Sequence, residues 1–160
     1  MVRTMLKKLS KNIAIGLFSS FIYGLTEICF RGFTHWTMLL LAFIVGLILS
    51  YINNEFLEFD DYYEYQVFFG TIVCVVFEYI FGMIFNQDFS IWDYRGSWGT
   101  IHALGDQVNL VFIGAWALIC FFGLPMLDFL QWKLDLAPEP YYTFILTGKK
   151  RYYIFKRKGE

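Results

Sequence analysis

The sequence has little charge, and it lacks the features that mark several classes of soluble protein. Charged residues make up 17% of the 160 residues, and 13 Lys and Arg nearly balance 14 Asp and Glu. This composition disfavours a disordered tail, which needs high net charge, and direct nucleic-acid binding, which needs a basic excess. The cysteines, Cys29, Cys74 and Cys120, each lie in an apolar run and are too few for a secreted disulfide scaffold. Motifs for hydrolysis or phosphate binding are missing, so we expect no cofactor.

Apolar and aromatic residues are abundant instead. The hydrophobic fraction is 58%, the aromatic fraction is 22% and the mean hydropathy is +0.49, whereas soluble domains are about 45–50% apolar. A helix needs about 20 mostly apolar residues to cross a bilayer. We therefore expect an all-α membrane protein with a four-helix transmembrane bundle in residues 1–132, followed by a C-terminal unit in residues 138–160. The four predicted spans cover residues 13–30, 36–52, 66–85 and 108–127, with Trp132 as an alternative end of the fourth.

The basic residues are concentrated at the two ends of the chain. Four precede the first span and seven follow the fourth, and only Arg31 and Arg95 lie between. The positive-inside rule then places both termini in the cytoplasm, which agrees with an even number of crossings. The basic start resembles a signal peptide, but the first run is long and has no Ala-x-Ala exit, so we expect it to be retained. We expect a multi-pass protein of the bacterial cytoplasmic membrane.

The C-terminal segment is typical of a short cytoplasmic β-hairpin. Pro138 and Pro140 end the helical structure, and two stretches rich in β-formers, residues 141–146 and 151–156, flank a Gly-containing loop at 147–150. An isolated hairpin is only marginally stable, so we expect it to lean on the bilayer, on the hairpin of a neighbouring subunit or on a cytosolic partner. A disordered basic tail on anionic lipid is the alternative. The cations available for lipid or partner are Lys149, Lys150, Arg151, Lys156, Arg157 and Lys158.

Two carboxylates, Glu27 and Glu78, fall inside predicted spans. An ionised carboxylate at the centre of a membrane helix costs about 2.5–3.5 kcal/mol on the mildest scales, so each needs a partner, a proton or water. Arg31 lies one helical turn after Glu27, and we predict an ion pair between them. A purely structural role in helix packing is the alternative for both carboxylates.

Each carboxylate shares a helix face with small residues that are spaced three or four positions apart. Such faces let helices approach closely. We therefore expect both carboxylates to face the packed interior rather than lipid. The predicted packing residues are Gly16, Ser20 and Gly24 on the face of Glu27, and Gly70, Cys74 and Gly82 on the face of Glu78.

The predicted outer connection, residues 86–107, is longer and chemically richer than the four to six residues or so that many loops need. It combines acids, a base, a histidine, aromatics and glycines. An ion pair of Asp93 with Arg95 or Arg31 could pin this loop to the membrane surface. A metal site built from Asp93, His102 and Asp106 lacks tight ligand spacing, and we expect no metal.

Three short elements of the sequence resemble the small membrane proteins known as putative ABC-transporter permeases of the CmpB type. These elements are Phe77-Glu78-Tyr79, Trp92-Asp93-Tyr94-Arg95 and Asn109-Leu110, and Glu27 followed by Arg31-Gly32-Phe33 is similar to the first-span signature of that family. The similarity covers roughly residues 15–130 and implies no ATPase and no reaction. The resemblance draws attention to Glu27, Arg31, Glu78, Trp92, Asp93, Tyr94 and Asn109.

The sequence favours a non-enzymatic, transporter-like or channel-like protein. In this hypothesis an outward-facing polar cleft, lined by Glu27, Arg31 and Glu78 and covered by the loop from Trp92 to Arg95, handles an ion, a proton or a small polar ligand. Four short spans leave little room for a private pathway, so we expect a homo-oligomer in contact with membrane lipids.

Two other classes of function stay open. The first is a membrane anchor or sensor that engages a cytosolic protein through its hairpin and its acidic inner loop, for example in a bacterial stress or antiphage system. The second is an enzyme that acts on lipid headgroups with Asp93, His102 or Asp106 as an acid, a base or a metal ligand.

Overall fold

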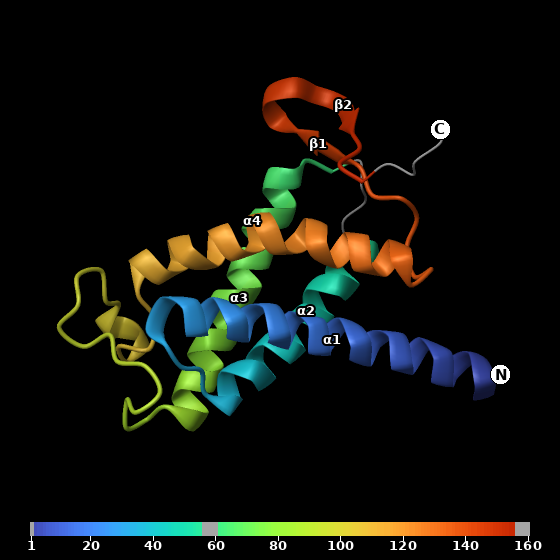
Figure 1. Cartoon of the computed structure of the whole chain (residues 1–160). Coiled ribbons are helices and arrows are strands. Elements are labelled where there is room, and N and C mark those ends of the chain that lie inside the picture. Colours follow the sequence, from blue (N-terminus) through green and yellow to red (C-terminus); the bar gives the residue numbers. More distant parts are fainter. Residues whose placement is uncertain (1, 56–60, 156–160) are drawn as a thin grey trace.

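The computed structural model describes residues 2–55 and 61–155, and this part of the chain is mostly helical (Figure 1). A small antiparallel hairpin of two strands follows the helices. The predicted combination of helices with a C-terminal hairpin is thereby confirmed. The elements are α1 (Val2–Arg31), α2 (Trp36–Glu55), α3 (Tyr63–Phe85), α4 (Leu110–Lys133), β1 (Tyr142–Phe144) and β2 (Gly148–Tyr152).

Three helices of the described residues are long and apolar enough to cross a membrane. They are Lys8–Arg31 within α1, with 24 residues, α3, with 23 residues, and α4, with 24 residues. The apolar part of α2, Trp36–Ile52, is shorter. The three long apolar helices are compatible with a membrane protein, as the composition predicts.

The helices extend beyond the predicted apolar runs at several ends. Helix α1 begins at Val2 rather than residue 13, and α4 ends at Lys133, close to the alternative end predicted at Trp132 and beyond residue 127. An apolar run stops at the first polar side chain, here Asp128, whereas a helix stops where its backbone hydrogen bonds stop. Asp128 therefore lies inside α4 and is almost fully buried.

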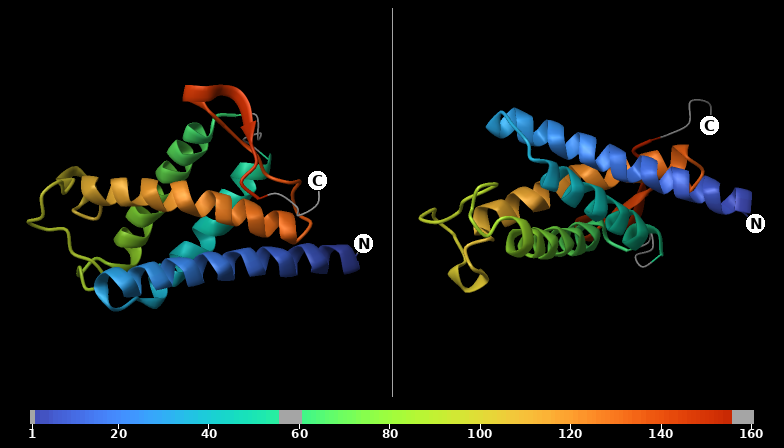
Figure 2. Two further views of the ribbon diagram at one scale, coloured as in Figure 1. Left: turned by 45° about the horizontal axis from the view of Figure 1, so that its top comes forward. Right: turned by 90° about the horizontal axis from the view of Figure 1, so that it is seen from below.

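Helices α1 and α4 run in roughly opposite directions in Figure 1 and cross at an angle in the right-hand view of Figure 2, and α2 and α3 cross behind them in the view of Figure 1. Helix α1 packs along α2, α3 packs along α4, and α2 also contacts α3. The long connection between α3 and α4 lies at one end of this arrangement. The hairpin lies at the start of α3 (Figure 1).

Small residues of α1 lie where this helix meets α2. A Cβ atom added to Gly16 would come within 2.5 Å of the Phe43 ring, and one added to Gly24 would lie 2.8 Å from Leu39. The hydroxyl of Ser20 donates a hydrogen bond of 2.7 Å to the carbonyl of Leu39. These three positions therefore permit the close approach of the two helices.

The small residues of α3 have two different neighbours. A Cβ atom added to Gly70 would lie 3.2 Å from the sulfur of Cys120 on α4, and the sulfur atoms of Cys74 and Cys120 are 3.6 Å apart. Gly82 makes room for the loop rather than for a helix, because the side chain of Gln107 lies over it. Helix packing thus explains Gly70 and Cys74, whereas Gly82 accommodates the loop.

Pro125 lies inside α4 without ending the helix. Proline has no backbone N–H, so the carbonyl four residues earlier, that of Phe121, loses its helical donor. The hydroxyl of Tyr63, at the start of α3, donates a hydrogen bond to this carbonyl. A side chain of one helix therefore satisfies the backbone group that proline releases in the other.

The hairpin turns earlier than the sequence suggests. Strand β1 pairs with β2 from Tyr142 opposite Tyr152 to Phe144 opposite Gly148, so the connection is residues 145–147 and not 147–150. Gly148 has a φ of +65°, a conformation that glycine adopts at no steric cost and that lets the chain pair directly after the turn. Residues 149 and 150 consequently belong to the strand. The cations predicted at 156, 157 and 158 lie outside the described residues.

The hairpin leans on the helix ends of its own chain, a support that the sequence analysis did not consider. The Tyr142 hydroxyl donates a hydrogen bond of 2.9 Å to Asp128 on α4. The Thr143 hydroxyl donates one of 3.1 Å to the carbonyl of Asp61, just before α3. The marginal stability of an isolated hairpin is thus offset by contacts with both helices.

Candidate functional site

The centre of the candidate site is the carboxylate of Glu78 on α3, which is 2% exposed. One carboxylate oxygen accepts a hydrogen bond of 2.9 Å from the Tyr94 hydroxyl, and the other accepts one of 3.1 Å from the indole N–H of Trp116. Within the described part of the chain, no cationic side chain forms an ion pair with Glu78. The structure therefore holds a buried carboxylate between two neutral donors.

The second carboxylate, Glu27 on α1, has a cationic partner. The guanidinium of Arg31 lies 3.2 Å from it, which confirms the predicted ion pair. The hydroxyl groups of Tyr23 and Thr34 also donate hydrogen bonds to Glu27, at 3.3 and 2.5 Å. Its charge is balanced within its own surroundings, in contrast to Glu78.

An aromatic pair joins the two carboxylates. The rings of Tyr23 and Trp116 stack with their centroids 5.3 Å apart and their planes 9° from parallel. Tyr23 donates to Glu27 and Trp116 donates to Glu78, so each ring of the stack is hydrogen-bonded to one of the two acids. Neither aromatic residue was predicted from the sequence as part of the site. An indole N–H inside an apolar run needs a hydrogen-bond acceptor, and this requirement could have indicated that Trp116 contacts a buried carboxylate.

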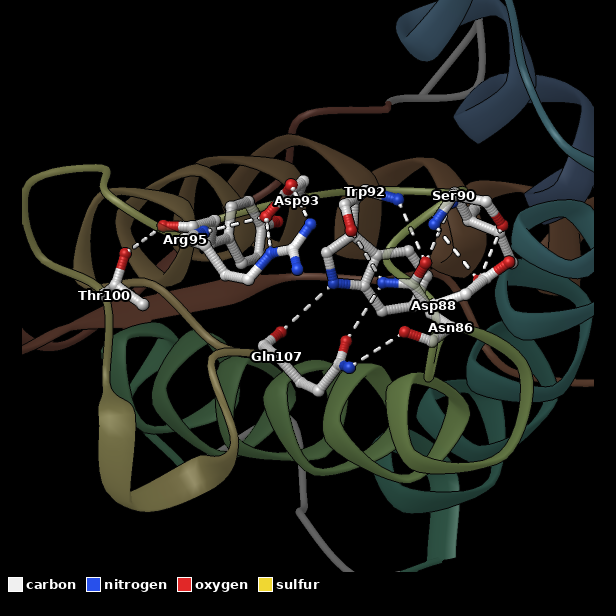
Figure 3. A network of polar contacts seen from close by, with 10 residues as sticks. Asn86, Asp88, Ser90, Trp92, Asp93, Arg95, Thr100 and Gln107 are labelled. Atoms are coloured by element: carbon white, nitrogen blue, oxygen red, sulfur yellow. Dashed lines mark hydrogen bonds and ion pairs between the residues drawn. The ribbon is translucent and has the colours of Figure 1, made fainter.

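Asn86 and Gln107 hold the two ends of the long loop together (Figure 3). The Asn86 amide nitrogen donates to the carbonyl of Trp92, at 2.7 Å, and to the side chain of Gln107, at 3.0 Å. The amide nitrogen of Gln107 donates in turn to the Asn86 carbonyl, at 3.0 Å. Both side chains are fully buried. These two amides, which sequence reasoning also missed, fix the loop that covers Glu78.

Trp92 and Tyr94 point into the protein from this loop. The indole N–H of Trp92 donates to the carbonyl of Gln107, at 3.2 Å. Burial raises the pKa of the Tyr94 hydroxyl, and the negative charge of Glu78 raises it further. Tyr94 therefore keeps its proton and donates a hydrogen bond to the carboxylate. Arg31 ties the same loop to α1 by a hydrogen bond of 3.2 Å to the carbonyl of Ile91.

Asp93 and Arg95 are exposed to solvent and pair with each other rather than with Glu78. The guanidinium of Arg95 donates two hydrogen bonds to the Asp93 carboxylate, at 2.9 and 2.7 Å (Figure 3). These bonds lower the pKa of Asp93 to about 2. Of the two predicted partners of Asp93, Arg95 and Arg31, the structure shows Arg95. The pair stiffens the outer side of the loop and makes no contact with the buried carboxylates.

Asn109 lies at the start of α4 and caps this helix. Its side-chain oxygen accepts a hydrogen bond of 2.8 Å from the N–H of Val111, and its nitrogen donates one of 3.0 Å to the carbonyl of Trp98. This arrangement satisfies a free N–H of the first helical turn. The structure thus gives Asn109 a positioning role, and it does not bring the side chain to Glu78.

The histidine and acids of the loop do not converge. His102 lies 2.6 Å from Asp106, whereas Asp93 pairs with Arg95. Among residues 2–55 and 61–155, no group of three His, Cys, Asp or Glu side chains is arranged to hold a metal ion.

An apolar cavity of about 80 Å³ lies between the helices, on the side of Tyr23 and Trp116 away from the loop. Residues of α1, α2 and α4 line most of it, together with Cys74 of α3. Tyr23 and Trp116 form part of its wall, but Glu78 does not line it. In this structure the carboxylate is covered on the loop side by Tyr94.

Comparison of the chain with family models, with curated proteins and with solved structures gave no match. The resemblance to CmpB-type permeases therefore stays a prediction.

Proposed function

We propose that this chain is a non-enzymatic integral membrane protein that takes up a proton or a small cation at Glu78, as part of a transporter or channel. The observation that supports this most is the burial of Glu78 between two neutral donors, with no cation paired to it in the described residues. A buried charge without a counter-charge costs free energy. Uptake of a proton or a cation would remove that cost.

In this proposal the loop over Glu78 is the outer cover of the site. Tyr94 is the loop residue that donates directly to the carboxylate. Access from the outer side requires this hydrogen bond to break, while the Asn86 network holds the rest of the loop in place. The Glu27–Arg31 pair is hydrogen-bonded to the other ring of the aromatic stack, Tyr23, and keeps its own charge balanced.

We further propose that α2 is a fourth span, so that both termini lie in the cytoplasm of a bacterial cell. The distribution of basic residues supports this orientation. It places Glu27, Glu78 and the loop near the outer surface, and the hairpin near the inner surface. Four short spans enclose little space, which supports a pathway between the subunits of a homo-oligomer.

The test is a flux measurement in proteoliposomes that contain a pH-sensitive dye or, in a parallel preparation, a sodium-sensitive dye. We expect the wild-type protein to dissipate a proton or sodium gradient, and we expect Glu78→Gln to abolish this flux, because glutamine cannot exchange a proton or bind a cation as a carboxylate does. Asp88→Asn is the matched control, since Asp88 is exposed and bonds to Ser90. The proposal would be contradicted if vesicles with the wild-type protein showed no more ion flux than vesicles without protein. It would also be contradicted if Glu78→Gln showed the same flux as the wild type.

A further inference from the structure

The connection between β1 and β2 exposes large apolar side chains. Leu146 is 95% exposed and Ile145 is 51% exposed. Exposed apolar side chains are unfavourable in water. At the tip of an ordered hairpin they usually indicate that another surface covers them.

This tip adjoins the exposed apolar face of α3. Ile145 lines a shallow hollow together with Tyr65, Phe68 and Phe69 of this helix, all three of which are exposed. Helix α3 is long and apolar enough to cross a membrane, so these side chains would face lipid near the end of the span. The tip and the helix therefore form one continuous apolar surface.

The position of the tip relative to α3 is fixed by hydrogen bonds. The N–H of Ile145 donates to both carboxylate oxygens of Glu64, at 3.2 Å each, in the first turn of α3. Tyr142 and Thr143 attach the preceding strand to Asp128 and to the chain before α3. Because the tip is already ordered, little conformational entropy is lost when it meets a surface.

Cationic side chains follow the tip directly. Lys149, Lys150 and Arg151 are consecutive and exposed on β2. The guanidinium of Arg151 lies over the ring of Tyr141, 4.6 Å from its centroid. Apolar tips flanked by cations and tyrosines are typical of protein segments that lie at the boundary between lipid headgroups and acyl chains.

We infer that the hairpin is a lipid-binding surface for an anionic membrane leaflet. Ile145 and Leu146 insert at the acyl boundary beside the first turns of α3, and Lys149, Lys150 and Arg151 bind the negative headgroups around them. The inference requires the helices to lie in a membrane, but it does not depend on any role of Glu78. It differs from a protein-binding hairpin because the apolar tip continues the lipid-facing side of a helix.

The test places a fluorescent NBD label at the tip. The variant Leu146→Cys is prepared in a full-length chain with Cys29→Ser, Cys74→Ala and Cys120→Ala, and it is reconstituted in liposomes with and without phosphatidylglycerol. Brominated acyl chains quench the label where it touches the hydrocarbon. Ser97→Cys in the same background is the matched control, since Ser97 is an exposed polar residue of the outer loop.

We expect brominated lipid to quench the Leu146 label at least about twofold more than the Ser97 label, and anionic lipid to increase this difference. The triple variant Lys149→Glu, Lys150→Glu and Arg151→Glu should lose the dependence on phosphatidylglycerol. The inference would be overturned if brominated lipid quenched both labels equally and aqueous iodide quenched the tip label. This result would indicate a surface for a protein partner. Quenching that ignores both the anionic lipid and the triple variant would overturn headgroup binding.

Discussion

Asn86 illustrates how single polar residues hold the covering loop over the candidate site. This side chain is 0% exposed, and its oxygen also accepts the N–H groups of Ile91 and Trp92, at 2.8 and 3.3 Å. A buried amide with all its partners rigidifies a segment, whereas its removal leaves several buried groups without partners.

We therefore expect Asn86→Ala to lower the free energy of unfolding by about 1–3 kcal/mol, the usual cost of buried groups left without a partner. The measurement is thermal unfolding of the purified protein in detergent. Gln87→Ala is the control, because Gln87 is exposed, lies just after α3 and donates a hydrogen bond to the Met83 carbonyl of that helix. A variant as stable as the wild type would contradict the structural role of this amide.

The pairing of Asp93 with Arg95 predicts a dependence on pH. The pKa of Asp93 is lowered to about 2, whereas an unfolded aspartate has a pKa of about 3.9. Since the folded value is the lower one, the pair stabilises the loop above the unfolded pKa, and this contribution is lost as the pH falls towards 2. We expect the melting temperatures of wild type and Asp93→Asn to differ at pH 6 and to converge as the pH approaches 2. A difference that stays constant over this range would contradict the pairing.

At the scale of helices and strands, the sequence predicts where apolar segments lie but not what joins them. The lengths of the apolar runs place all four helices, and the Glu27–Arg31 pair follows from the helical repeat because its members are one turn apart. Trp116 meets Glu78 across 38 positions of the chain, and no local periodicity predicts such a contact. The role of Asp128 was also missed: the predicted fourth span ends at residue 127, with Trp132 as the alternative, and neither end predicts the hydrogen bond from Tyr142.

The packing of α3 on α4 predicts a specific cross-link. The sulfur atoms of Cys74 and Cys120 are 3.6 Å apart, and a disulfide needs about 2.05 Å, so only a small movement is required. Copper phenanthroline, as the oxidant, should convert this thiol pair to an intramolecular disulfide with the loss of two hydrogens, detected by peptide mass spectrometry. Cys29 is the control, because it is exposed on α1 and has no cysteine near it in the described residues. Cys29 should stay a free thiol, and Cys74 and Cys120 that also stay free after the oxidation would contradict this helix packing.

At the scale of the whole molecule, polar groups gather at the two ends and apolar residues lie between. Glu27, Glu78 and the covering loop form one end, and Asp128 with the hairpin forms the other. The distribution of charge along the chain predicts which end faces the cytoplasm, but it does not predict that the hairpin attaches to its own helices. That attachment depends on Tyr142 reaching Asp128, a tertiary contact with no local pattern.

The proposed orientation has a direct consequence for accessibility. In intact cells, a membrane-impermeant maleimide should label Ser97→Cys but not Lys150→Cys, and permeabilised cells should show labelling at both. The three native cysteines are replaced in both variants. Labelling of Lys150→Cys in intact cells would reverse the orientation, and it would move the Glu78 site to the cytoplasmic side.

We propose that Glu78 itself takes up a proton or a cation. Infrared difference spectroscopy of the reconstituted protein, recorded between low and high pH and between sodium and a large organic cation, reports this directly. We predict a change in the carboxyl bands that is missing from Glu78→Gln and preserved in Asp88→Asn. Identical difference spectra for the wild type and Glu78→Gln would contradict the claim, because Glu78 would then be only a structural acceptor for Tyr94 and Trp116.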